Sequence, residues 1–196
     1  MQRFLFILSL LLVCACSNEQ DMQWVKIEGE KYHFGDNEGK ENESPSVPIK
    51  VKDFYLTDTE ITVDQFKTFI EQTGYKTTAE KNGFSFIFKN GAWKEVNGAC
   101  WNNPSGAHEE LTSFLDHPVT HLSYKDMLAF CNWAGARLPS EVEIEFAMKQ
   151  GGSTKMNIWT GDFPARNNGE DGFIETNPVK HYDANRLGLY GLKGNV

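Results

Sequence analysis

The feature that most constrains the fold is the final stretch of the chain, from Gly152 to Val196, which contains no periodic segment of useful length. This stretch is rich in glycine, asparagine, aspartate and proline, which favour turns and loops. A compact domain rarely tolerates so long an irregular stretch unless something else organises it. We therefore expect a bound ion, or a comparable device, to hold this part of the chain in place.

Asn157 and Asp171 are candidate ligands for such an ion. Calcium takes oxygen atoms from carboxylates, amide side chains and backbone carbonyls, and the glycines on either side of Asp171 let the backbone fold around an ion. The Asp171-Gly172 pair is also typical of an ordinary turn. Ligand chemistry alone leaves a metal site and a simple turn both open.

Size and charge exclude several classes of protein. A chain of 196 residues is long enough for one sizeable core, and 40% hydrophobic with 23% charged residues describes a globular chain. The formal net charge is −8, so no broad basic surface is available for phosphate contacts. Nucleic acid is therefore not an expected partner.

The first residues read as an export signal. Arg3 precedes an apolar run from Phe4 to Val13, which is too short to span a bilayer and suits a signal peptide. The segment around Cys16 resembles a bacterial lipobox, which predicts cleavage before Cys16 and lipid on its sulfur. We expect a lipoprotein signal peptide over 1–16, a polar tether over 17–23 and one domain over 24–196, exported and lipid-anchored to the cell envelope on its periplasmic or outer surface. Ordinary secretion and an uncleaved anchor are the alternatives.

Three segments begin with a capping box, in which a Ser or Thr side chain and a residue three positions later cap the first helical turn. They start at Thr62, Ser123 and Ser140, and each continues with apolar residues at helical spacing. The second stripe places Cys131 in the core, and the third contains Ile144, Ala147 and Met148. Two alternating runs around Gly29, from Trp24 to Phe34, predict a hairpin, and Val47 to Leu56 predicts a strand.

Other candidate chemistry has ordinary explanations. His117 and His121 flank a short strand-like run, but no third or fourth ligand lies at a zinc-type spacing. Cys100 and Cys131 read as structural thiols, and their spacing cannot show whether they form a disulfide. The acidic residues that start the third helix, Glu141, Glu143 and Glu145, are expected to complement the helix dipole and face water.

Read together, the segments resemble the formylglycine-generating enzyme family, also called the sulfatase-modifying factor family. The matching pieces span nearly all of the chain from Trp24 onward and occur in the family's order. They include Phe54-Tyr55-Leu56, Thr59-Glu60-Ile61-Thr62, Thr73-Gly74-Tyr75, Gly98-Ala99-Cys100-Trp101, Arg137-Leu138-Pro139-Ser140-Glu141, Asn157-Ile158-Trp159, Gly169-Glu170-Asp171-Gly172-Phe173 and Gly188-Leu189-Tyr190 with Gly194-Asn195-Val196.

The resemblance implies an α+β fold of irregular, C-type-lectin-like type, with little regular secondary structure and bound calcium. One calcium site would use the side chains of Asn157 and Asp171 and the backbone carbonyls of Ile158 and Phe173. A second family site would use the backbone near Gly194 and Val196 and an Asn or Asp side chain at the position of Gly191. Because glycine offers no such oxygen, the second site is incomplete in this sequence.

The resemblance also implies a chemistry, the oxidation of a sulfatase cysteine to formylglycine with molecular oxygen and a copper(I) ion held by two cysteines. Those two cysteines lie beyond the Gly194-Asn195-Val196 segment in the family, and Cys100 and Cys131 do not match them. We therefore expect an amino-terminal portion of a bacterial lipoprotein member, incomplete at its C-terminus and inactive alone, with no catalytic residue of its own. A sulfatase polypeptide or a cell-envelope protein is the expected partner. The alternative is a non-catalytic cell-envelope lipoprotein that uses the fold as a binding or structural module.

Overall fold

The computed structural model describes residues 22–196 except 90, 108–109 and 153. The predicted signal peptide, the lipidation site Cys16 and most of the predicted tether lie outside the described residues. The described part begins inside the folded body, because Met22 is buried in a core cluster and the Gln23 carbonyl accepts a hydrogen bond from the Asp58 N–H at 2.9 Å. The structure thus includes Met22 and Gln23 in the domain, although the sequence predicts a tether over 17–23.

Small sheets and short helices make up the fold, which confirms the predicted mixed α+β class. In the described residues each sheet has two antiparallel strands, and the elements follow one another in this order. They are β1 (Trp24–Ile27), β2 (Lys31–Phe34), β3 (Val47–Lys50), β4 (Phe54–Thr57), α1 (Val63–Thr73), α2 (Thr78–Asn82), β5 (Phe84–Lys89), β6 (Ala92–Asn97), α3 (Tyr124–Trp133) and α4 (Glu141–Gly151), with 3-10 turns at Glu41–Glu43 and Leu111–Ser113.

The predicted hairpin around Gly29 is wrong. β1 pairs with β4 and β2 pairs with β3, so each strand of the predicted hairpin finds its partner beyond the 35–46 loop. Gly29 lies so close to the backbone of Val51 and Lys52 that a Cβ there would overlap both. The glycine therefore permits two chain segments to cross closely, which the sequence pattern alone could not distinguish from a tight turn.

The three helices predicted from capping boxes are confirmed. Thr62, Ser123 and Ser140 each accept a hydrogen bond from the backbone N–H three residues later, and Gly74 closes α1 in the left-handed conformation. Cys131 faces the core as predicted. In α4, however, Phe146 is buried together with Ala147, whereas Ile144 and Met148 remain partly exposed.

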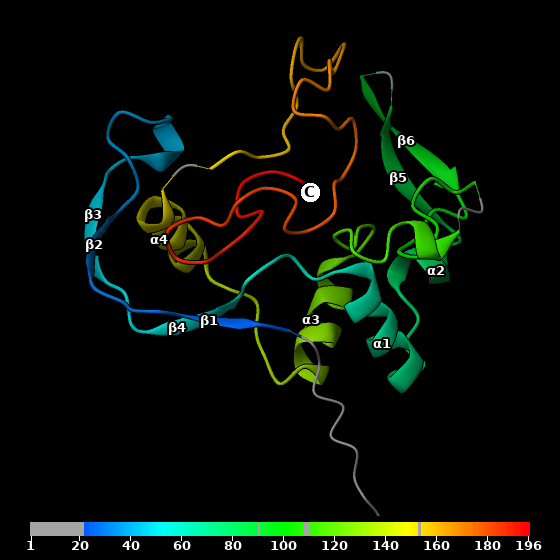
Figure 1. The fold of residues 1–196 in the computed structure, drawn as a ribbon, viewed down its shortest axis with the longest axis horizontal. Helices are drawn as coiled ribbons and strands as arrows, with labels where there is room; N and C mark the ends of the chain where they lie inside the picture. Colours follow the sequence, from blue (N-terminus) through cyan, green and yellow to red (C-terminus); the bar gives the residue numbers. More distant parts are fainter. Residues whose placement is uncertain (1–21, 90, 108–109, 153) are drawn as a thin grey trace, which may run out of the picture.

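Two aromatic-rich clusters form the core. The first contains Phe66 and Phe69 of α1 and Phe130 of α3, whose rings pack within 6 Å of each other. The second contains Phe146 of α4, Phe54 of β4 and Leu189. Figure 1 shows the corresponding groups of elements around a centre that the final segment crosses.

As predicted, the described residues after α4 contain no helix or strand. This final segment is nevertheless tied to the rest of the fold by backbone hydrogen bonds. The Val179 N–H donates to the Asp116 carbonyl, the Arg186 N–H to Gly151 and the Tyr190 N–H to Asp58. Within the described part of the chain, every helix is too short or too polar to span a bilayer.

Candidate functional site

The four residues predicted for the first calcium site lie together in the final segment. The Asp171 carboxylate accepts a hydrogen bond from the Ile158 N–H at 2.7 Å and another from the Phe173 N–H at 3.2 Å. The Asn157 amide donates to the Glu175 carbonyl at 2.7 Å. These bonds hold the 157–158 and 171–175 stretches side by side, so the loop conformation itself brings the predicted ligands together.

The oxygen atoms of this loop cluster suit calcium. A carboxylate has about four acceptor positions, so Asp171 keeps capacity beyond its two N–H donors. The Asn157 Nδ2 makes both of that side chain's hydrogen bonds, to Glu175 and to Asn195. In the described part of the chain, the carbonyl oxygens of Ile158 and Phe173 receive no hydrogen bond. One carboxylate, one amide oxygen and two carbonyls form the mixed oxygen set that calcium accepts.

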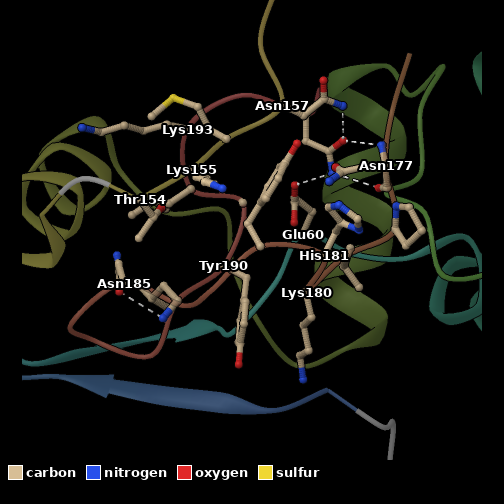
Figure 2. A pocket seen from close by; sticks show the side chains of 18 of the residues that line it. Glu60, Thr154, Lys155, Asn157, Asn177, Lys180, His181, Asn185, Tyr190 and Lys193 are labelled. Carbon is tan, nitrogen blue, oxygen red and sulfur yellow. Dashed lines mark hydrogen bonds between the residues drawn. The ribbon is translucent and has the colours of Figure 1, made fainter. Parts of the chain in front are cut away.

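Sequence reasoning missed the residue that joins this segment to the rest of the fold, Asn195. Its Oδ1 accepts hydrogen bonds from the Asn177 N–H at 2.8 Å and from Asn157 Nδ2 at 3.2 Å. Its Nδ2 donates to Glu60 Oε1 at 3.0 Å and to the Asn177 carbonyl at 3.2 Å (Figure 2). Asn195 also adopts φ 74°, a left-handed conformation that asparagine tolerates better than most residues.

Glu60 is one of the residues that line the same cavity as Asn177 and Asn195, and it lies near Asn177 (Figure 2). Burial raises the pKa of its carboxyl, and the hydrogen bond from Asn195 offsets only part of that effect. Its Oε2 and the Asn177 Nδ2 are buried without a protein partner among the described residues. An unpaired acceptor and an unpaired donor lining one cavity suit a bridging water or another small polar ligand.

The second predicted calcium site lacks a side-chain oxygen at Gly191, as the sequence indicated. A Cβ at Gly191 would overlap the Glu60 carboxylate, so an Asn or Asp side chain would not fit there without displacing Glu60. Gly194 packs against the Asn157 carbonyl, and Val196 is exposed. Calcium at Gly194 and Val196 remains a prediction that nothing in these contacts supports further.

The two candidate histidines do not meet. His117 Nδ1 lies 2.9 Å from Thr176 Oγ1, and His121 Nδ1 lies 2.8 Å from Ser85 Oγ. Burial lowers the pKa of His121. Among the described residues no group of three or more His, Cys, Asp or Glu side chains could hold a metal.

The two described thiols lie in different settings. Cys100 and Cys131 are free, and burial raises the pKa of both. The Cys100 S–H donates to Asn102 Oδ1 at 2.9 Å, while Cys131 lies in the apolar face of α3. Without a bound metal, both thiols are therefore protonated at neutral pH.

Two of the acidic residues at the start of α4 do more than face water. Glu143 forms a paired contact with Arg137 at 2.6 and 2.8 Å, which is the main reason its pKa falls to about 2. Glu145 accepts hydrogen bonds from the Tyr32 hydroxyl at 2.6 Å and the Gly35 N–H at 3.0 Å. Glu145 thus joins α4 to the β2 region, whereas Glu143 holds the start of α4 to Arg137 in the segment before it.

Comparisons with known proteins identify the family. The profile of the sulfatase-modifying factor enzyme 1-like domain matches residues 13–196. The chain is 35% identical over 189 residues to formylglycine-generating enzyme of Bos taurus, covering 80% of this chain and 50% of that protein. It is 34% identical over 207 residues to the enzyme of Streptomyces coelicolor, covering 88% and 66%. It is also 32% identical to the inactive C-alpha-formylglycine-generating enzyme 2 of Bos taurus, covering 91% and 70%.

Solved structures show the same fold. PvdO from Pseudomonas aeruginosa is 17% identical, with a TM-score of 0.65 over 91% of this chain and 69% of that one. CarF is 19% identical, with a TM-score of 0.52 over 90% and 78%. The chain spans about half the length of the formylglycine-generating enzymes of Bos taurus and Mus musculus that it matches. With a family profile that matches nearly all of its length, the chain belongs to the formylglycine-generating enzyme, or sulfatase-modifying factor, family.

Proposed function

We propose that this chain forms the scaffold of a protein that modifies sulfatases, and that a calcium ion organises its final segment. The observation that carries the proposal is the convergence of Asn157, Ile158, Asp171 and Phe173 in a segment without helices or strands. Calcium bound there would neutralise Asp171 and fix the 157–175 loops against each other. Asp171 holds the Ile158 and Phe173 backbones, and Asn157 links the cluster to Asn195.

A calcium titration of thermal stability tests this scaffold. We expect calcium at about a hundredfold above its Kd to raise the Tm by about 5 to 10 °C. Asp171→Asn should abolish the calcium-dependent part of the Tm. Asp162→Asn, which changes an exposed carboxylate in the same segment, should leave it intact. If wild type and Asp171→Asn have Tm values equally indifferent to calcium and to chelator, the loop cluster is not a calcium site.

The activity proposed for the whole protein is formylglycine formation in a sulfatase, as the relatives' names indicate for those proteins. We assign no step of that oxidation to Cys100 or Cys131, because neither matches the positions of the family's two copper-binding cysteines. We therefore expect the 196-residue chain, incubated with copper and a peptide containing Cys-x-Pro-x-Arg, to form no aldehyde by mass spectrometry. An aldehyde would overturn this assignment, and its loss in Cys100→Ser or Cys131→Ser would identify the thiol responsible.

A second candidate is a non-catalytic module of the cell envelope. The chain is similar to a relative that is named an inactive formylglycine-generating enzyme, so a family sequence can occur without the activity. This similarity favours the non-catalytic function. Calcium binding is common to both candidates. A purified full-length protein that binds a sulfatase peptide without oxidising it would favour this second function.

We also propose export and lipid attachment at Cys16. The motif lies outside the described residues, so its support is the sequence alone. Expression with a radiolabelled fatty acid should label the wild-type chain and place it in the membrane fraction. Cys16→Ser should lose both label and membrane association, and an unlabelled wild type would contradict lipid attachment.

A further inference from the structure

The sheet formed by β1 and β4 has one buried face and one open face. Val25 lies opposite Leu56 and Ile27 opposite Phe54, and the second core cluster buries Ile27 and Phe54. Because side chains alternate between the two faces of a strand, the residues between these positions point away from the core. They are Trp24, Lys26, Tyr55 and Thr57, which we call the outer sheet face.

Two large rings are exposed on the outer sheet face. Trp24 is 46% exposed and Tyr55 is 60% exposed. The register sets Trp24 opposite Thr57 and Tyr55 opposite Lys26, so the two rings are diagonal neighbours across the pair of strands. Tryptophan and tyrosine combine an apolar body with a polar N–H or O–H group, and both are therefore enriched at the boundary between lipid and water.

The charges around the outer sheet face are balanced. Lys26 Nζ lies 3.1 Å from Asp53 Oδ2 and 3.8 Å from Glu28 Oε1. Both acids lie just beyond the paired residues, at the end of the sheet opposite the start of β1. Near the start of β1, the Asp58 carboxylate lies 2.7 Å from Lys180 Nζ. These three carboxylates thus have lysine partners, which reduces the repulsion that a chain of net charge −8 meets at anionic lipids.

The lipid attachment proposed above limits the distance between this face and a membrane. Cys16 lies six positions before Met22, which is buried in the first core cluster. A polypeptide extends at most about 3.5 Å per residue, so Met22 lies within about 20 Å of a lipid-bearing Cys16. Since β1 begins at Trp24, lipid attachment keeps the start of β1 near the membrane, and the outer sheet face with it.

Other exposed rings lie far from the start of β1. Trp93 of β6 is 69% exposed and Phe86 of β5 is 52% exposed. Figure 1 shows β1 and β4 toward the lower edge of the molecule and the β5–β6 hairpin at its upper right. A short connection to a lipid favours the exposed rings next to it over exposed rings in general. Trp93 and Phe86 therefore provide matched controls.

We propose that the outer sheet face lies on the surface of the phospholipid bilayer that holds Cys16, with the Trp24 and Tyr55 rings among the lipid headgroups. This inference rests on lipid attachment at Cys16, which is itself a proposal made above. The lipid attaches the chain, and the two rings orient the domain, because a nearby anchor raises their effective concentration at the membrane. Attachment thus depends on Cys16, whereas orientation depends on the fold.

The test uses the full-length, lipid-modified chain in phosphatidylcholine vesicles whose acyl chains carry bromine near the headgroup. Bromine quenches tryptophan fluorescence on contact, so we expect the vesicles to quench the wild-type chain. Trp24→Phe keeps a ring but removes the reporter, and it should lose most of the quenching. Trp93→Phe should keep the wild-type quenching. Tyr55→Ser should lose part of it, whereas Phe86→Ser, which removes a ring from the hairpin, should not.

Two controls separate orientation from folding and from lipid attachment. Because Trp24 and Tyr55 are largely exposed, Trp24→Phe and Tyr55→Ser should keep the wild-type Tm. Both variants should also float with the vesicles and carry a radiolabelled fatty acid, since Cys16 is unchanged. A wild-type chain without the label would contradict lipid attachment and overturn this inference with it.

A labelled, floating chain overturns the orientation alone if Trp24→Phe is quenched as strongly as wild type. A second copy, or another part of the protein, covering the outer sheet face would shield Trp24 from bromine and give that same overturning result. Quenching that is lost in Trp93→Phe and kept in Trp24→Phe would place the hairpin on the membrane instead, and would likewise overturn the proposal.

Discussion

Asp126 is the residue on which the junction between α2 and α3 depends. Its carboxylate is fully buried and accepts hydrogen bonds from the Ser123 N–H at 2.8 Å, the Thr78 N–H at 3.0 Å and the Tyr75 hydroxyl at 2.9 Å. Burial opposes ionisation, but the hydrogen bonds from Ser123, Tyr75 and Thr78 outweigh it and hold the pKa below its ordinary value. A charged acceptor in the core thus joins segments that the sequence separates.

We expect Asp126→Asn to lower the free energy of unfolding at pH 7 by about 2 to 4 kcal/mol, because an amide cannot accept all of these donors. The lowered pKa means that the ionised form contributes stability above the unfolded-state pKa, and that this contribution is lost as pH falls through the folded pKa. Urea titrations should therefore show the difference between wild type and variant shrinking below about pH 4. Asp64→Asn, at an exposed position in the first turn of α1, should change stability by less than about 1 kcal/mol. If the stability difference between wild type and Asp126→Asn does not change with pH, the charge of the Asp126 carboxylate is not the cause of that difference.

At the scale of elements, the sequence predicted those features that depend on residues close together in the chain. The Thr62, Ser123 and Ser140 boxes each involve residues three positions apart, and all three helices begin where those boxes stand. Strand pairing was mispredicted at Gly29 and not predicted for β5 and β6, because pairing depends on distant partners and on close backbone approach. The 78–82 helix also went unrecognised, although Thr77 and Glu80 form the same box.

The cap of α1 offers a test at this scale. Thr62 Oγ1 accepts from the Gln65 N–H, and the Gln65 side chain accepts from the Thr62 N–H. Thr62→Ala should lower the free energy of unfolding by about 1 kcal/mol, and Thr62→Ser should recover most of it. Thr68→Ala, in the middle of the same helix, serves as the control, since alanine is a good helix former. Equal effects of Thr62→Ala and Thr62→Ser in urea denaturation would assign the loss to the methyl group and not to the cap.

Considered as a whole, the molecule depends on its final segment to join groups of elements that share few direct contacts. The sequence pointed to Asn157 and Asp171 through local chemistry, and the structure places them together. Glu60 and Asn195 went unrecognised because they meet across 135 positions of sequence. Such a contact leaves no pattern at any short spacing, so only the folded chain reveals that Asn195 connects Glu60, Asn157 and Asn177.

Asn195→Asp tests this connection while keeping the size of the side chain and its tolerance of positive φ. The variant loses both Nδ2 donations and sets a carboxylate against Glu60, so we expect a loss of about 2 to 4 kcal/mol. Adding Glu60→Gln should restore about half, because it removes the like charge. In hydrogen exchange the loss should concentrate in residues 154–196, while α1 and α3, with their own aromatic cluster, keep their protection. Uniformly faster exchange, or no rescue by Glu60→Gln, would mean that Asn195 stabilises the molecule in some other way than by connecting the final segment to the first part of the chain.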